Sequence, residues 1–197
     1  MHADHALEPI NRAVFLDRDG VINVEKGYLH RSEDFEFLPG VPQALHLLKE
    51  AGFLLVVVTN QSGVARGYYP LEDVYELHRH LQRELAATGV AIDRFYICPH
   101  HPDHGPGSQP EECSCRKPLP GMIEKALSDF QIDPARCYLV GDKLSDIEAG
   151  RAAGCRCLLV RTGHGSVSEK GAPKELTIVD DLPAAARFIL DEDFHGK

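Results

Sequence analysis

The stretch FLLVVVTN, residues 53–60, constrains the fold of this chain more than any other segment does. A continuous run of β-branched and apolar residues is typical of a strand that is covered on both faces. A helix pattern precedes it over residues 41–52, and a longer amphipathic one follows over residues 71–89. A buried strand between two helices is the repeating unit of a parallel sheet. The segment therefore predicts an α/β fold.

The same alternation of strand and helix patterns continues along the chain. Further strands are expected over residues 12–17, 93–99, 137–142, 155–161 and 176–181, and further helices over residues 121–132, 146–154 and 182–192. A length of 197 residues suits one sizeable core. We therefore predict a doubly wound, mostly parallel sheet in a single domain over residues 1–197.

Composition limits the kinds of partner and the compartment. The formal net charge of -9 argues against a nucleic acid or an anionic membrane as partner, because the chain offers no uniform positive field. No apolar stretch reaches the length of a membrane span, and residues 1–12 lack the basic and apolar regions of a signal peptide. We therefore expect a cytoplasmic monomer, in which the six cysteines form no structural disulfides.

Polar and charged residues gather where several of the expected strands end. They are Asp17 and Asp19 after the first strand, Thr59, Asn60, Gln61 and Ser62 after the second, and Asp142, Lys143 and Asp146 after the strand at 137–142, with Arg116 and Lys117 before the helix that leads to it. Ligands of such sheets bind beyond the carboxyl ends of the strands, so we expect these side chains to converge. A plain Asp-Gly turn is the alternative for residues 17–20, but it leaves the other acidic strand end unexplained.

Together these residues carry the groups that phosphoryl transfer requires. Asp17, Asp19 and Asp142 form a cluster of hard oxygen ligands that suits Mg²⁺, and a carboxylate can also act as a nucleophile. Thr59 and the backbone N–H after it can donate to phosphoryl oxygens. Lys117 supplies a positive charge that keeps Asp17 ionised, and Asp19 can protonate the leaving oxygen.

The motifs DRDG, TNQSG, RKP and GDKLSD occur in this order at residues 17–20, 59–63, 116–118 and 141–146. They resemble the four motifs of the haloacid dehalogenase (HAD) superfamily of phosphatases, and the resemblance extends over residues 12–190. It implies a HAD-like Rossmann-type sheet, a nucleophile at Asp17 and a general acid/base at Asp19. It also implies Mg²⁺ held by the Asp17 carboxylate, the Asp19 backbone carbonyl and Asp142. Asp146 would then orient a metal-bound water or Lys143.

One irregular segment, residues 98–118, interrupts the alternation and is rich in Pro, Gly, His and Cys. It contains four soft ligands that suit a closed, tetrahedral and hence structural Zn²⁺ site: Cys98, His100, Cys113 and Cys115. His101 and His104 are rival ligands, and a mobile loop with incidental cysteines is the alternative. The remaining cysteines are expected to be small core residues, and histidines on helix patterns are expected to be solvated or to cap helices: Cys137, Cys155, Cys157, His46, His78 and His80.

A zinc loop between the second and third motifs resembles the histidinol-phosphatase-like branch of the superfamily, and no cap domain is visible after Gly20. An open site with several local cations suits a sugar bisphosphate whose second phosphate lies away from the one that is cleaved. For Arg18 we expect a positional role, with a solvated charge and a ligand contact as equal alternatives. The residues expected to bind the substrate are Asp17, Arg18, Asp19, Glu25, Lys26, Gly27, Tyr28, Thr59, Asn60, Gln61, Ser62, Arg66, Arg116, Lys117 and Lys143.

Three other functions share parts of this pattern. A phosphatase of the same branch that cleaves histidinol phosphate would use the same catalytic residues with different substrate loops. A non-enzymatic phospho-acceptor module also gathers acidic strand ends and a lysine around Mg²⁺, but Asp19 and the donors at 59–62 favour turnover. A zinc-dependent interaction protein does not account for the catalytic set.

Overall fold

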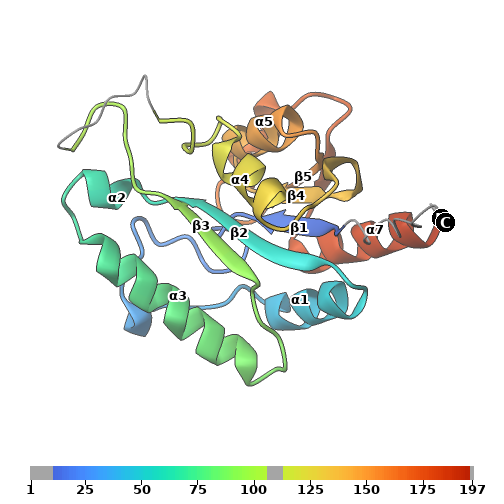
Figure 1. Ribbon diagram of the computed structural model, residues 1–197, viewed down its shortest axis with the longest axis horizontal. Coiled ribbons are helices and arrows are strands. Elements are labelled where there is room, and N and C mark those ends of the chain that lie inside the picture. Colours follow the sequence, from blue (N-terminus) through green and yellow to red (C-terminus); the bar gives the residue numbers. More distant parts are fainter. Residues whose placement is uncertain (1–10, 106–112, 196–197) are drawn as a thin grey trace, which may run out of the picture.

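Six parallel strands form one sheet in the computed structural model, which describes residues 11–105 and 113–195 (Figure 1). The strands are β1 (Ala13–Leu16), β2 (Leu54–Asn60), β3 (Arg94–Cys98), β4 (Tyr138–Gly141), β5 (Arg156–Val160) and β6 (Thr177–Val179). Their order is β3-β2-β1-β4-β5-β6, and every neighbouring pair is parallel. The predicted doubly wound α/β sheet is confirmed. The expectations for the N-terminal residues 1–10 and for residues 106–112 of the zinc loop lie outside the described residues.

Helices cover both faces of the sheet, as the continuous apolar strands require (Figure 1). One face carries α1 (Val41–Glu50), α3 (Leu71–Ala86) and α7 (Leu182–His195), and the other carries α4 (Gly121–Asp129) and α5 (Leu144–Ala152). Two single-turn helices, α2 (Ser62–Ala65) and α6 (Gly165–Ser168), follow β2 and β5. Three short 3₁₀ turns complete the helical elements of the described residues: η1 (Ser32–Asp34), η2 (Pro134–Arg136) and η3 (Glu169–Gly171).

The central strand β1 divides its side chains between two cores. Val14 and Leu16 pack with α1, α3 and α7, whereas Ala13 and Phe15 pack with α4 and α5. All four residues are fully buried, because alternate side chains of a strand point to opposite faces and both faces are covered here. The end of β1 is therefore a rigid platform for the residues that follow it.

The order of the strands reverses at β1, which pairs with β2 on one side and with β4 on the other. Such a reversal opens a crevice beyond the carboxyl ends of the strands. The three strands that meet there are the ones followed by residues 17–20, 59–63 and 141–146. Between β1 and α1 the chain forms only η1 and loops, which confirms that no large cap domain is inserted there.

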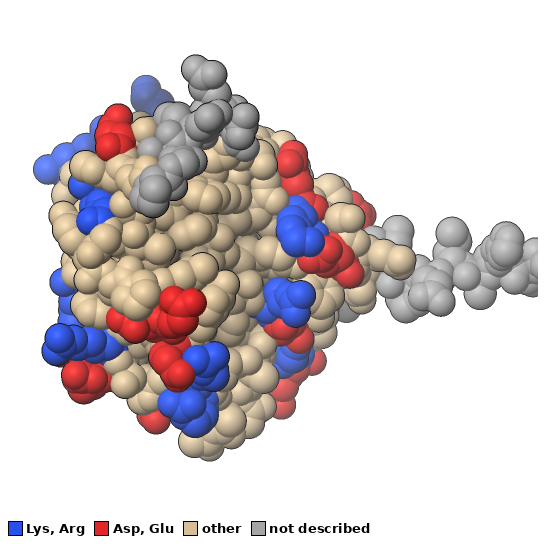
Figure 2. Space-filling model, turned by 60° about the vertical axis from the view of Figure 1, so that its left-hand side comes forward, with Lys and Arg blue, Asp and Glu red and all other residues tan. Residues whose placement is uncertain are grey.

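Figure 2 brings forward the side of the molecule that carries α2 and the loop after β3. Acidic and basic side chains lie interspersed on this face, without a uniform basic patch. Among the described residues, every helix is too short or too polar to cross a membrane.

Candidate active site

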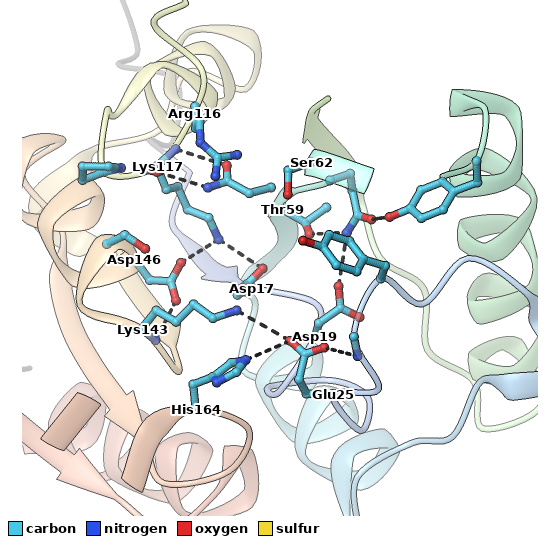
Figure 3. Close-up of a pocket in the computed structure, with 17 residues that line it drawn as sticks. Asp17, Asp19, Glu25, Thr59, Ser62, Arg116, Lys117, Lys143, Asp146 and His164 are labelled. Carbon is cyan, nitrogen blue, oxygen red and sulfur yellow. Dashed lines mark hydrogen bonds and ion pairs between the residues drawn. The ribbon is translucent and has the colours of Figure 1, made fainter. Parts of the chain in front are cut away.

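A pocket of about 670 Å³ lies at the carboxyl ends of β1, β2 and β4 (Figure 3). It is lined by residues from all three strand ends, from the loop after β1, from the segments before α3 and α4, and from the loop after β5: Asp17, Asp19, Glu25, Gly27, Tyr28, Thr59, Asn60, Gln61, Ser62, Tyr69, Arg116, Lys117, Pro118, Lys143, Ser145, Asp146 and His164. The expected convergence of the strand-end residues is therefore what the structure shows.

Asp17 and Lys117 form a buried ion pair at the floor of this pocket (Figure 3). Lys117 Nζ lies 3.1 Å from Asp17 Oδ1 and donates to the carbonyl oxygen of Val58 at 2.8 Å. The backbone N–H of Arg18 donates to the same Oδ1 at 2.7 Å. Both of these contacts to the Asp17 carboxylate fall on Oδ1, which leaves Oδ2 available for attack. Burial raises the pKa of Asp17 to about 6, although the charge of Lys117 opposes the shift.

The position of Lys117 is fixed by the end of β2 and by α5. The side chain of Asn60 accepts from the Lys117 N–H and donates to the Lys117 carbonyl, both at 3.1 Å. Asp146 Oδ1 lies 2.7 Å from Lys117 Nζ. Burial alone would lower the pKa of Lys117, but the two carboxylates of Asp146 and Asp17 raise it above its ordinary value. The lysine is therefore a fixed cation beside the candidate nucleophile.

The resemblance implied that Asp146 orients a metal-bound water or Lys143, and the structure places its carboxylate between Lys143 and Lys117. Its Oδ2 accepts the backbone N–H of Lys143 at 3.0 Å, as part of a cap at the start of α5, and its Oδ1 faces Lys117. The Lys143 ammonium instead lies 3.6 Å from Glu25. Asp146 thus holds the Lys143 backbone and faces the Lys117 ammonium, and its role toward a metal-bound water stays a prediction.

Asp142 is fully buried beside Asp17, and two glycines approach its carboxylate closely. A Cβ atom on Gly20 or Gly163 would clash with the Asp142 carboxylate, and both glycines have positive φ angles. Asp142 Oδ2 accepts the His164 N–H at 2.8 Å, whereas Oδ1 has no hydrogen-bond partner in the described residues. Burial, followed by the charge of Asp17, raises the pKa of Asp142 to about 7.

These properties fit a divalent cation. Carboxylate oxygens of Asp17, Asp142 and Asp146 lie within 4.8 Å of one another. An orphaned buried oxygen costs free energy unless a partner compensates it. A hard cation would provide that partner and would favour the ionised carboxylates. The donor set of the pocket therefore suits Mg²⁺.

Asp19 has surroundings unlike those of Asp17, because hydrogen-bond donors bracket its carboxylate. Arg18 Nη2 lies 3.0 and 2.8 Å from its two oxygens, and the Asn23 and Gln61 amides donate at 2.9 and 3.2 Å. Burial alone would raise the pKa of Asp19, but the charge of Arg18 and these donors lower it. Asp19 also lines the pocket.

Arg18 itself is fully buried, so its interpretation as a solvated charge is wrong. Its guanidinium binds Asp19, the Leu29 carbonyl and His78, and its side chain does not line the pocket. The expectation that His78 is solvated or caps a helix is also wrong, because this side chain is only 5% exposed. It lies four residues after Val74 and three before Leu81, on the buried face of α3.

The end of β2 supplies polar groups that face the same pocket. Thr59 is fully buried, and its Oγ1 accepts from Gln61 Nε2 at 2.9 Å. Tyr69 donates to Gln61 Oε1 at 3.2 Å and fixes that amide. Ser62 begins α2 and lines the pocket. The four expected residues of this motif are thus brought together.

The loop after β1 closes one side of the pocket. Glu25, Gly27 and Tyr28 line it, but Lys26 points to the surface, where its ammonium binds the Asp34 carbonyl. The structure therefore gives Lys26 no place at the site. Tyr28 has a φ of 56°, which is unusual for a bulky residue and marks a constrained loop.

His164 lines the pocket without having been expected there. Its Nε2 lies 3.4 Å from Glu25, and the same carboxylate faces Lys143 (Figure 3). His164 follows the carboxyl end of β5, so the rule that places ligands beyond strand ends could have found it. Tyr69 and Ser145 line the pocket too and were not expected from the sequence.

The four expected zinc ligands lie together. His100 Nδ1 is 3.2, 3.5 and 3.8 Å from the sulfurs of Cys113, Cys115 and Cys98, and the Cys98–Cys113 and Cys113–Cys115 sulfur distances are 3.8 and 3.4 Å. Around a tetrahedral ion with Zn–S of about 2.3 Å and Zn–N of about 2.0–2.1 Å, such atoms lie about 3.6–3.8 Å apart. The cluster therefore has the dimensions of a zinc site.

The rival histidines have another partner. His101 and His104 each lie 2.8 Å from the guanidinium of Arg66. Arg66 thus supports the loop after β3 and does not line the pocket, contrary to expectation.

Arg116 does line the pocket, and its guanidinium donates to the His100 carbonyl at 2.9 Å. Cys137 and Cys155 are buried core residues as expected, and Cys157 is partly buried.

The fold and the strand-end motifs define a phosphoric monoester hydrolase of the HAD type, and the HAD-hydrolase-like family model matches residues 114–185. A D-glycero-beta-D-manno-heptose-1,7-bisphosphate 7-phosphatase of Haemophilus ducreyi is 45% identical over 177 residues, which cover 87% of this chain and 97% of that protein. The phosphatase of the same name from Escherichia coli (strain K12) is 45% identical over 178 residues, which cover 89% and 93%. The chain belongs to the HAD superfamily, in the family of these heptose-bisphosphate phosphatases.

Solved structures agree with this assignment. The D,D-heptose 1,7-bisphosphate phosphatase from B. bronchiseptica, in complex with magnesium and phosphate, is 35% identical with a TM-score of 0.82, and covers 93% of this chain and 99% of that chain. The phosphatase of the same name from Burkholderia thailandensis is 34% identical with a TM-score of 0.68, over 95% and 100%.

Proposed function

We propose that this protein is a Mg²⁺-dependent phosphatase that removes the 7-phosphate of D-glycero-D-manno-heptose 1,7-bisphosphate. The observation that carries the proposal is the buried Asp17–Lys117 pair beside the orphaned Asp142 oxygen, in a pocket with further cations at its mouth. Relatives of 45% identity are named for this reaction.

The reaction divides into two displacements. Oδ2 of Asp17 attacks the phosphorus, the bond from phosphorus to the sugar oxygen breaks, and Asp19 gives that oxygen its proton. A water molecule then attacks the aspartyl phosphate and passes a proton to Asp19, which releases inorganic phosphate and restores the Asp17 carboxylate. The dianionic phosphate of a bound substrate raises the pKa of Asp19, because a like charge disfavours the ionised form. Asp19 can therefore carry a proton when substrate is present.

Asp17, Asp142 and the backbone carbonyl of Asp19 would hold the magnesium ion. The ion would neutralise charge on the phosphoryl oxygens. Lys117 keeps Asp17 ionised, Thr59 donates to a phosphoryl oxygen, and Asn60 holds Lys117 in place. The Cys98–His100–Cys113–Cys115 cluster would hold a structural Zn²⁺, which fixes the segment that carries Arg116 and Lys117.

The substrate is a bisphosphate because the pocket has more cations than one phosphate requires. Lys117 is buried and belongs to the transferring group, whereas Arg116 and Lys143 line the pocket but are only partly buried, nearer to the solvent. Glu25 Oε2 lies 3.6 Å from Lys143 Nζ and 3.4 Å from His164 Nε2, and a carboxylate in this place can bind sugar hydroxyls. This arrangement favours a sugar with a second, distant phosphate over histidinol phosphate, which has one.

The test compares phosphate release from the heptose bisphosphate and from histidinol phosphate, each with Mg²⁺. We expect kcat/KM to be at least about 10²-fold higher for the bisphosphate, which corresponds to two added charge-assisted hydrogen bonds. Asp17→Asn, purified in parallel, controls for contaminating phosphatases. Preference for histidinol phosphate would reassign the substrate, and a long-lived phosphoprotein without turnover would make the chain a phospho-acceptor.

A further inference from the structure

The proposed reaction uses Asp19 but does not explain why a fully buried arginine lies directly behind it. Arg18 has no exposed surface, and burying an isolated guanidinium is costly unless it is paired and hydrogen-bonded. Its partners are the two oxygens of Asp19, the Leu29 carbonyl at 3.1 Å and the His78 ring. Because burial of a guanidinium costs free energy, its presence here indicates a function that a smaller residue would not fulfil.

His78, which lies 60 positions later in the chain, is the partner of the Arg18 guanidinium on the side away from Asp19. Its Nε2 lies 3.3 Å from Arg18 Nη1, and it must accept there because a guanidinium only donates. The ring of Phe95 on β3 stacks on the imidazole, with centroids 4.3 Å apart and planes inclined by 19°. Burial and the charge of Arg18 lower the pKa of His78 to about 3, so the ring is neutral and its Nε2 is free to accept.

We propose that Arg18 and His78 are positioning residues that fix the Asp19 carboxylate for proton transfer to the leaving oxygen. Arg18 Nη2 donates to both Asp19 oxygens and Nε donates to Oδ1 at 3.3 Å, so the planar fork sets the plane of the carboxylate. His78 in turn fixes the fork, since it lies opposite Asp19 on the guanidinium. This inference rests on the proposed function, in which Asp19 is the acid and base.

The inference has a chemical consequence that a purely structural role lacks. A sugar oxygen is a poor leaving group and needs a well-placed acid, whereas a nitrophenolate leaves without a proton. Misplacing Asp19 should therefore slow the first step, the phosphorylation of Asp17, much more with a sugar phosphate than with p-nitrophenyl phosphate, whereas hydrolysis of the aspartyl phosphate is common to both substrates. Single-turnover kinetics separates the first step from the second. Substrate binding through Lys117 and Arg116 should change little, so the loss should appear in kcat and not in KM.

The experiment replaces His78, which touches neither the metal ligands nor the pocket that binds substrate. His78→Met removes the acceptor at similar size, and His78→Gln restores an acceptor near the position of Nε2. His80→Met on the same helix is the matched control, because His80 packs on Phe35 away from the site. We expect His78→Met to lower kcat about 10–10²-fold on the heptose bisphosphate, in the range for a misplaced catalytic group. His78→Gln should recover most of the rate.

Three results would decide the matter. Equal losses of His78→Met in the phosphorylation step with the sugar and nitrophenyl phosphates, measured in a single turnover, or no loss at all, would overturn the positioning role. If His78→Met does not fold, Arg18→Lys serves instead, since it keeps the charge but loses the fork; it should show the same dependence on the leaving group, and a uniform loss would again refute the inference. Failure of the proposed function would differ, because the wild-type protein would then cleave no sugar phosphate with Mg²⁺.

Discussion

At the scale of single residues, Asp17 and Asp19 stand two positions apart but have opposite surroundings. Burial raises the pKa of Asp17 to about 6 beside the other carboxylates, whereas Arg18 and neutral donors lower that of Asp19. Two titratable groups whose pKa values are driven apart usually have different roles in a reaction. Two carboxylates can therefore stand this close together after β1, because one is the proposed nucleophile and the other the proposed acid and base.

Exchange of each carboxylate for an amide should separate the two roles. Asp17→Asn should abolish turnover, because an amide is a poor nucleophile and a weak metal ligand. Asp19→Asn should still bind substrate but lose about 10²–10⁴-fold in kcat, as expected for a missing acid/base. Steady-state kinetics on the heptose bisphosphate measures both. Near-normal activity of Asp17→Asn would exclude a covalent intermediate at this position.

Arg116 should determine the preference for a bisphosphate. Arg116 precedes Lys117 in the sequence, but its side chain is only partly buried where it lines the pocket. From there its guanidinium can bind a second phosphate bidentately. Arg116→Ala should raise KM for the bisphosphate more than for a sugar monophosphate, by about 1.5–3 kcal/mol of binding free energy. Because Arg116 also binds the His100 carbonyl, equal losses on both substrates would mean that it only supports the loop.

At the scale of elements, the segment after β3 depends on its four soft ligands. The protein should contain about one Zn²⁺ per chain by elemental analysis, since four ligands close a tetrahedral site. Cys113→Ser should release the ion and displace Arg116 and Lys117, which lowers activity. Cys157→Ala removes a sulfur outside the cluster and is the matched control. Zinc-free protein from a purification without chelators would contradict the site.

Long periodic segments could be predicted from the sequence, and short ones could not. The strand at 53–60 and the helix at 71–89 correspond to β2 and α3 within a few residues, because tertiary packing follows the same apolar pattern. The single turns α2 and α6 are too short to show a period. They matter nevertheless, since α2 begins with Ser62 and α6 follows His164.

The site shows the same division between local motifs and distant contacts. Asp17, Lys117 and Asp142 could be predicted because each stands in a motif at the end of a strand or before a helix. The burial of Arg18 could not, since it depends on His78 from a helix 60 positions later. His164 lies at a strand end but carries no motif that distinguishes it from an ordinary turn residue.

At the scale of the whole molecule, the neutral His78 should make stability depend on pH. Its pKa is lowered from 6.5 to about 3 in the folded state, so the unfolded chain binds the extra proton. The stabilisation is complete above pH 6.5 and is lost as the pH falls from 6.5 toward 3. At pH 5 the difference amounts to about 2 kcal/mol of unfolding free energy.

Urea unfolding at pH 7 and pH 5 measures this effect. His78→Gln should lose less stability than the wild type between the two values, because glutamine does not titrate. His80→Gln, on the same helix, is the matched control for the substitution itself. An identical pH dependence of wild type and His78→Gln would show that His78 is accessible to protons in the folded state.

The central claim is that one pocket, built around Asp17, removes the 7-phosphate of a heptose 1,7-bisphosphate and leaves the other. Phosphorus NMR of the reaction with Mg²⁺ tests it most directly, because the two phosphates of the substrate give separate signals. The 7-phosphate signal should decay into inorganic phosphate while the 1-phosphate signal persists, and Asp17→Asn should leave both unchanged. Loss of the 1-phosphate first, or an equal loss of both, would contradict the account.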